Sequence, residues 1–96
     1  MILWVRGKRG IGKTTLAKQI QASMPHSILL DGDSMRECIT KDLGFTDEDR
    51  LENNLRIAGL AKKLSEQGHN VIVATICPAK IKKAVYYESK CRFIDL

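Results

Sequence analysis

A glycine-rich stretch near the start of the chain has the residue types and spacing of a phosphate-binding loop. It fits the pattern G-x-x-x-x-G-K-[ST] at every fixed position. Glycines let consecutive backbone N–H groups turn inward around an anion, and a helix that follows adds the positive end of its dipole. Lys13 would then contact the β- and γ-phosphates of a nucleotide, and the Thr14 hydroxyl would bind Mg²⁺. We expect the nucleotide to bind Gly7, Lys8, Arg9, Gly10, Ile11, Gly12, Lys13, Thr14 and Thr15.

The residues around this loop favour that function over a chance glycine-rich turn with a solvated lysine. Residues 1–5 form an apolar run that is typical of a buried strand, and residues 15–22 are helix-forming. A strand, a glycine loop and a helix in this order are what phosphate binding at a helix N-terminus requires.

A second set of polar residues lies in the segment Leu-Asp-Gly-Asp-Ser-Met-Arg, residues 30–36. One of the carboxylates of Asp31 and Asp33 could accept a proton from a substrate hydroxyl, or help to hold Mg²⁺ through water, and Arg36 could bind an anionic group of the acceptor. The alternative is that Asp33 only caps a helix that begins at Ser34.

These residues need a scaffold, and the rest of the chain predicts alternating strands and helices. We expect strands at 1–5, 27–31 and 70–76, and a fourth that begins at Phe93. Helices are predicted at 15–22, at 34–41, from a Thr46 cap to a stop at Gly68, and after Pro78. In the long helix an apolar stripe is expected at Leu51, Leu55, Ile57, Ala58, Leu60, Ala61 and Leu64. This order predicts an α/β fold, a single domain over 1–96 with a parallel sheet and helices on both of its faces.

Composition narrows the function classes. The chain has 96 residues, a net charge of +5 and three cysteines without metal-ligand spacing, so neither a disulfide framework nor a zinc site is expected. No apolar run is long enough to span a bilayer and no secretory leader is visible, so we expect a cytoplasmic location and no membrane partner. Nucleotide ligands explain the positive charge. Nucleic acid is a weaker interpretation, because the few aromatic residues do not interleave with the basic ones.

Four blocks of sequence together resemble the adenylylsulfate kinase family of P-loop kinases. They are the phosphate loop, Asp-Gly-Asp-Ser-Met-Arg at 31–36, Lys-Asp-Leu-Gly-Phe at 41–45 followed by Asp-Arg-Leu-Glu-Asn at 49–53, and Val-Ile-Val-Ala-Thr-Ile-Cys-Pro at 71–78. The order and near-family spacing extend to about Pro78 and weaken beyond it. The phosphate loop is shared by many NTPases, but the pair of blocks between 41 and 53 is specific to this family.

The resemblance implies transfer of the γ-phosphate of ATP, with Mg²⁺, to the ribose 3′-hydroxyl of adenylylsulfate. Lys13 and Asp33 then take the catalytic roles, and Thr14 is the metal ligand. The family's acceptor-binding residues correspond to Asp33, Arg36, Phe45, Arg50, Asn53, Ile76 and Cys77.

Several of these positions have a structural alternative. Phe45 could fill the core beneath a loop, Arg50 could pair with Asp47 or Glu48, and Asn53 could be a solvated helix residue.

The sequence also departs from the family pattern. Cys77 replaces a serine that some members phosphorylate, so no phosphorylated intermediate is expected here. Ala79 and Lys80 replace an aromatic residue and an arginine, and Lys8 and Arg9 replace small or uncharged loop residues. The basic stretch 80–92 is either a solvated helix face or part of the acceptor site.

From the resemblance we expect a full kinase of this type to be roughly twice this length, with the further part contributing a lid. We therefore expect this chain to be a fragment, a shortened relative that forms a homodimer, or a nucleotide-binding module without turnover. Another small-molecule P-loop kinase, acting on a nucleoside, a sugar or a polynucleotide end, is the remaining alternative.

Overall fold

The fold of the chain is a parallel sheet with helices on both faces, as predicted. A computed structural model describes residues 1–96. The four strands have the order β2-β3-β1-β4, and every neighbouring pair is parallel. Its elements are β1 (Ile2–Arg6), α1 (Lys13–Ser23), β2 (Ile28–Asp31), α2 (Gly32–Arg36), α3 (Asp47–Glu66), β3 (Val71–Thr75), the 3-10 helix η1 (Ala79–Ile81), α4 (Lys82–Ser89) and β4 (Arg92–Asp95).

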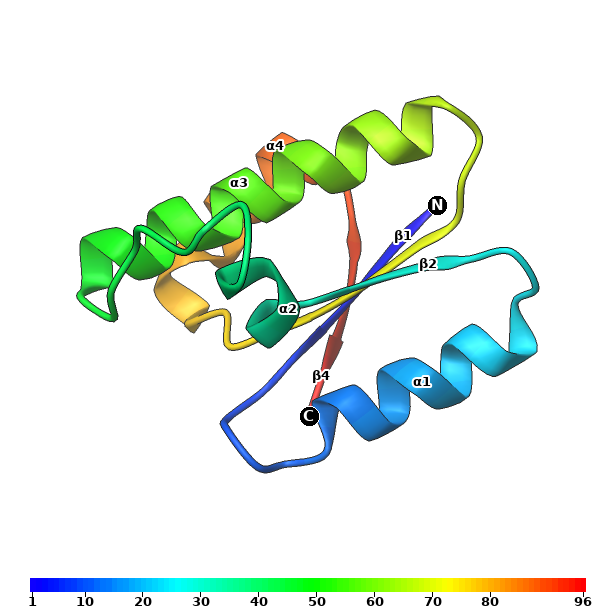
Figure 1. The fold of residues 1–96 in the computed structure, drawn as a ribbon, viewed down its shortest axis with the longest axis horizontal. Helices are drawn as coiled ribbons and strands as arrows, with labels where there is room; N and C mark the ends of the chain where they lie inside the picture. Colours follow the sequence, from blue (N-terminus) through cyan, green and yellow to red (C-terminus); the bar gives the residue numbers. More distant parts are fainter.

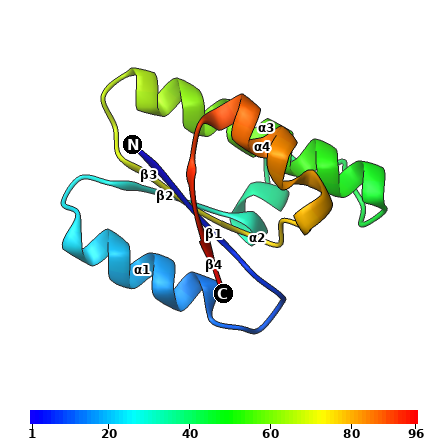
Figure 2. The same ribbon diagram turned by 180° about the vertical axis from the view of Figure 1, so that it is seen from behind.

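The two faces of the sheet are covered by different helices (Figures 1 and 2). Alternate residues of the central strand β3 point to opposite sides: Val71 and Val73 pack with α3 and α4, and Ile72 and Ala74 pack with α1. Each face therefore has its own apolar cluster. All five residues of β3 are buried, as expected for a strand that is covered on both faces.

The predicted helix boundaries hold at most positions. Helix α1 ends at Ser23, ahead of Pro25. Helix α3 begins after Thr46, whose side chain accepts a hydrogen bond from the Asp49 N–H at 3.1 Å, and it ends just before Gly68. These limits follow from local chemistry, because an N-cap hydroxyl and a proline act on neighbouring backbone groups.

The helix predicted at 34–41 is wrong at both ends. Helix α2 spans only Gly32–Arg36, and turns follow it. The N–H groups of Cys38 and Thr40 both donate to the carbonyl of Met35, which closes a tight turn and brings Thr40 into the interior. The guanidinium of Arg36 then holds the next loop by donating to the carbonyls of Leu43 and Gly44.

The apolar stripe of α3 largely matches the predicted one. Ile57, Ala58 and Ala61 are fully buried and Leu51, Leu60 and Leu64 pack against the same core, whereas Leu55 is only partly buried and belongs to neither apolar cluster. The polar Asn53 and Asn54 near the start of the helix are buried as well. The first turns of α3 thus present amides to the interior, near the carboxyl ends of the strands. No helix is long and apolar enough to cross a membrane.

Candidate functional site

The main pocket lies at the carboxyl edge of the sheet, where the loops after β1, β2 and β3 meet. This is the edge at which open α/β sheets bind ligands. The pocket has a volume of about 630 Å³. It is lined by Arg9, Gly10, Gly12, Lys13, Thr14, Thr15, Asp31, Gly32, Asp33, Arg36, Phe45, Arg50, Asn53, Ala74, Thr75 and Ile76.

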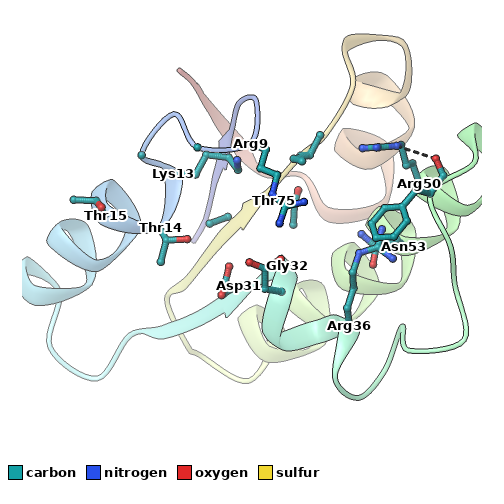
Figure 3. Close-up of a pocket in the computed structure, with 16 residues that line it drawn as sticks. Arg9, Lys13, Thr14, Thr15, Asp31, Gly32, Arg36, Arg50, Asn53 and Thr75 are labelled. Atoms are coloured by element: carbon teal, nitrogen blue, oxygen red, sulfur yellow. Dashed lines mark hydrogen bonds between the residues drawn. The ribbon is translucent and has the colours of Figure 1, made fainter.

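The pocket has two chemically different sides (Figure 3). Arg9, Lys13, Thr14 and Thr15 come from the loop after β1 and the start of α1, and Arg36, Arg50 and Asn53 lie opposite, on α2 and α3. Asp31, Gly32 and Thr75 lie between them. A phosphate donor on one side and an acceptor on the other would meet beside the carboxylates.

The loop before α1 has the geometry that an anion site requires. Gly12 is the N-cap of α1 at a φ of 97°, a left-handed conformation that side chains rarely adopt. The helix therefore begins at Lys13 with its first N–H groups free to face the pocket. In this structure the Lys13 Nζ donates to the Lys8 carbonyl at 2.8 Å, so the lysine lies folded over its own loop.

Two carboxylates act on Lys13. Partial burial lowers the pKa of its ammonium group, and the negative charges of Asp33 and Asp31 oppose that shift. Both aspartates are thus close enough to the phosphate-loop lysine to interact with it electrostatically. Asp33 does not cap α2, because that helix begins one residue before it and its N-cap, Asp31, makes no side-chain cap hydrogen bond. The capping alternative is therefore wrong, and the exposed carboxylate of Asp33 lines the pocket.

Phe45 is an exposed aromatic ring between two arginines. Its side chain is 68% exposed, so the alternative that it fills the core is wrong. The guanidinium carbon of Arg36 lies 4.3 Å from the ring centroid and that of Arg50 lies 5.9 Å from it. Arg50 also donates from Nε to the Phe45 carbonyl at 3.1 Å. It makes no ion pair with Asp47, which binds Lys80 instead. An exposed ring beside two cations suits an aromatic base that carries anionic groups.

Asn53 lies at the bottom of the same side. Only 4% of it is exposed, which excludes the solvated alternative, and its Oδ1 is buried without a hydrogen-bond partner in the chain. A buried acceptor without a partner is costly unless a ligand or water supplies the donor. Asn53 is thus placed to bind a polar group in the pocket.

The remaining predicted site residues lie outside the main pocket. Gly7, Lys8 and Cys77 line a second hollow of about 290 Å³, together with Arg6, Ile76, Pro78 and Leu96. Ile11 lines neither hollow. The basic stretch 80–92 does not reach the main pocket. Its Lys80 pairs with Asp47 and its Lys82 with Asp95.

Thr75 and Ala74 were not among the predicted site residues. They end the buried strand β3, and in the sequence they cannot be distinguished from the rest of its apolar run. The rule that parallel strands end at one edge of the sheet was the signal that could have identified them.

Cys77 is a buried thiol that burial keeps protonated. Burial raises its pKa to about 11, against the opposing effect of the Arg6 guanidinium, and it also raises the pKa of Cys91. Arg6 donates from Nε to the Cys77 carbonyl at 2.9 Å and from Nη1 to Asp95 at 3.0 Å, which joins the ends of β1, β3 and β4.

We therefore expect iodoacetamide at pH 8 to alkylate Cys38, which is exposed, much faster than Cys77 or Cys91. Peptide mass mapping in buffer and in urea measures this, and all three thiols should react once the chain is unfolded. Rapid modification of Cys77 in the folded protein would contradict the buried, protonated state.

The residues present fit a magnesium ion. Mg²⁺ usually takes one or two carboxylates, waters and substrate phosphates in place of an all-protein cage. The Thr14 hydroxyl and the carboxylates of Asp31 and Asp33 all line the main pocket, and both carboxylates interact with Lys13.

Comparisons with known proteins show what the chain is similar to. The profile of the family described as Adenylylsulphate kinase matches residues 1–95. The chain is 46% identical over 81 residues to an adenylyl-sulfate kinase of Pseudomonas aeruginosa, which covers 80% of this chain and 41% of that enzyme. The chain therefore spans less than half the length of this curated relative.

Two solved structures share the fold. The APS kinase of Mycobacterium tuberculosis, solved in complex with AMPPNP and APS, matches with a TM-score of 0.86 and 30% identity over 98% of this chain and 59% of that one. A hexameric APS kinase from Thiobacillus denitrificans matches with a TM-score of 0.83 and 27% identity, over 98% of this chain and 21% of that one. The relatives thus include a nucleotide- and APS-bound protein and an oligomer.

Proposed function

The chain belongs to the adenylylsulphate kinase family, and from this we propose that it binds ATP and transfers the γ-phosphate to the 3′-hydroxyl of adenylylsulfate. The observation that supports this most is the two-sided pocket, in which the phosphate loop faces Arg36, Phe45, Arg50 and Asn53 across Asp31 and Asp33. A binding site for the donor alone would not need the second side.

The donor side binds the triphosphate. The free N–H groups at the start of α1 and the ammonium group of Lys13 neutralise the phosphates. To do so Lys13 must exchange its hydrogen bond to the Lys8 carbonyl for the phosphate oxygens, which requires only side-chain rotation. Thr14, together with Asp31 or Asp33, would hold Mg²⁺, which would supply further charge neutralisation when bound.

The acceptor side binds and orients adenylylsulfate. Adenine stacks on the exposed ring of Phe45, and Asn53 Oδ1 accepts a hydrogen bond from the ligand. Arg36 makes both of its hydrogen bonds within the chain through Nη1, so Nε and Nη2 are available for the phosphosulfate. The Nη1 and Nη2 groups of Arg50 are available in the same way.

The chemical step asks little covalent chemistry of the protein. The 3′-oxygen forms a bond to the γ-phosphorus, the bond from that phosphorus to the bridging oxygen of ADP breaks, and the hydroxyl proton passes to the carboxylate of Asp33. Positioning and charge stabilisation dominate such transfers. Cys77 takes no part, because its thiol is buried and protonated.

The decisive experiment is transfer of labelled phosphate. The chain is incubated with γ-labelled ATP, Mg²⁺ and adenylylsulfate, and in parallel with a nucleoside, a hexose and a 5′-hydroxyl oligonucleotide. We expect a labelled product with adenylylsulfate alone. A product with another acceptor would contradict the proposed substrate.

A second candidate function is nucleotide binding without turnover, either as a binding module or as part of a kinase domain. It is favoured by the coverage of the Pseudomonas relative, of which this chain spans 41%. It predicts ATP binding with no labelled product from any acceptor. A partner copy that completes the site would restore the product, and sedimentation of the active sample would then show an oligomer.

A further inference from the structure

A series of hydrogen bonds runs from the core of the protein to the acceptor side of the pocket. The indole Nε1–H of Trp4 donates to Thr75 Oγ1 at 2.9 Å, and the Thr75 hydroxyl donates to Asn54 Oδ1 at 2.8 Å. The Asn54 Nδ2 group then donates to the main-chain carbonyls of Arg50 at 2.8 Å and Ile76 at 3.3 Å. Trp4 and Asn54 are fully buried, and Thr75 is 3% exposed.

The chemistry of these groups allows only one direction for the series. An indole N–H can donate and cannot accept, so Thr75 Oγ1 must be the acceptor at that end. At the other end, the main-chain carbonyls of Arg50 and Ile76 can only accept, so the amide atom of Asn54 that faces them must be Nδ2. Oδ1 then faces Thr75 and accepts the proton of its hydroxyl, so the orientation of the amide is determined by its neighbours. Every side-chain polar atom in the series has a partner.

The two carbonyls belong to different walls of the pocket. Arg50 lies in the first turn of α3, next to Asn53, whereas Ile76 lies in the loop after β3. Asn54 is therefore a link between the helix and that loop, 22 residues apart in the sequence. Thr75 also supports the wall between them, since a Cβ on Gly32 would lie 3.4 Å from the Thr75 methyl carbon and 3.3 Å from the Ala74 carbonyl.

We propose that Asn54 is a positioning residue of the acceptor side, which sets the separation of the α3 wall from the Ile76 loop, with its amide held by Thr75 on one side and by the two carbonyls on the other. This role rests on the proposed function, because it concerns the residues assigned to adenylylsulfate. No hydrogen bond of the series involves a donor-side residue, so binding of ATP should not depend on it.

The test compares the binding of two ligands to matched variants by titration calorimetry. Asn54→Leu removes the link and keeps the same number of side-chain heavy atoms, and Thr75→Val keeps the methyl group near Gly32 but removes the hydroxyl. Both should raise the Kd for adenylylsulfate about fivefold to tenfold, because the Asn54 link to the Ile76 carbonyl is lost or weakened, with the Kd for ATP unchanged. Thr75→Ser keeps the hydroxyl and loses only the methyl group, so it should bind adenylylsulfate more tightly than Thr75→Val does.

Ser89→Ala is the control for general destabilisation. The Ser89 hydroxyl is buried and donates to the Val85 carbonyl at 2.8 Å within α4, away from the pocket, so its loss should not alter either Kd. The proposal is overturned if folded Asn54→Leu binds adenylylsulfate as tightly as the wild type. An equal loss in Ser89→Ala also overturns it, because the effect is then general.

An NMR measurement separates this proposal from the proposed function. If the wild-type chain binds ATP but not adenylylsulfate, the proposed acceptor is wrong. The positioning role is then tested by the chemical shift of the Cys77 backbone amide, because the Ile76 carbonyl belongs to the same peptide group. This chemical shift should change in Asn54→Leu and remain unchanged in Ser89→Ala. The indole N–H of Trp4, the single tryptophan, should also move in Thr75→Val. Unchanged signals in both variants would overturn the proposal.

Discussion

Replacing Lys13 with alanine will weaken ATP binding by about tenfold to a hundredfold, and it will abolish detectable transfer of phosphate. The ammonium group lies at the start of α1, in the loop that faces the pocket, and its charge-assisted contacts to phosphate oxygens contribute about 1.5–3 kcal/mol to binding. In the ligand-free structure Lys13 makes a single hydrogen bond, to the Lys8 carbonyl, so its loss should alter the fold little.

The measurement is titration calorimetry with ATP and Mg²⁺, alongside thermal unfolding. Lys18→Ala is the matched control. Lys18 is exposed on the same helix and does not line the pocket, so this variant loses the same charge without the contact. An unchanged ATP affinity in Lys13→Ala would refute the assignment of the phosphate loop. An equal loss in Lys18→Ala would reduce the effect to general electrostatics.

The second large effect is expected for Asp33→Asn. Asparagine has nearly the same shape as aspartate but cannot accept the hydroxyl proton, so turnover should fall by about 10²- to 10⁴-fold. Binding of ATP should remain, because Asp33 makes no hydrogen bond that holds the loop and does not cap α2. Loss of its negative charge beside Lys13 should, if anything, favour the bound phosphates.

Single-turnover transfer to adenylylsulfate measures this effect, under conditions in which the wild type forms product. The control is Glu37→Gln, an exposed carboxylate four residues further on that lies outside the pocket. Full turnover in Asp33→Asn would show that this carboxylate is not the base. Asp31, the other carboxylate that interacts with Lys13, would then be the candidate.

The sequence alone determined the parts of the site that depend on neighbouring residues. The phosphate loop is built from consecutive backbone N–H groups and a helix start, so its pattern is visible in the chain. The Thr46 cap and the end of α1 before Pro25 are local for the same reason. Parallel strands all end at one edge, which is why the loops after β1 and β2 bring Lys13 and Asp33 near each other.

Only the tertiary structure decided which alternative holds at the acceptor residues. An exposed Phe45, a buried Asn53 and a Cys77 that lies in a separate hollow all depend on how loops pack. The prediction of a helix at 34–41 was wrong because the chain turns after Arg36 and buries Thr40, and helix propensity contains no information on such tertiary burial.

The same limit explains Asn54. In the sequence it is a polar residue on a helix, and its role depends on Trp4, Thr75 and Ile76, which are 21 or more residues away. Residues so far apart in the sequence form hydrogen bonds only when the folded core brings the donor and acceptor atoms to within about 3 Å of each other. Neighbouring residues in the sequence thus determine the chemistry of the donor side, whereas packing between distant segments determines the shape of the acceptor side.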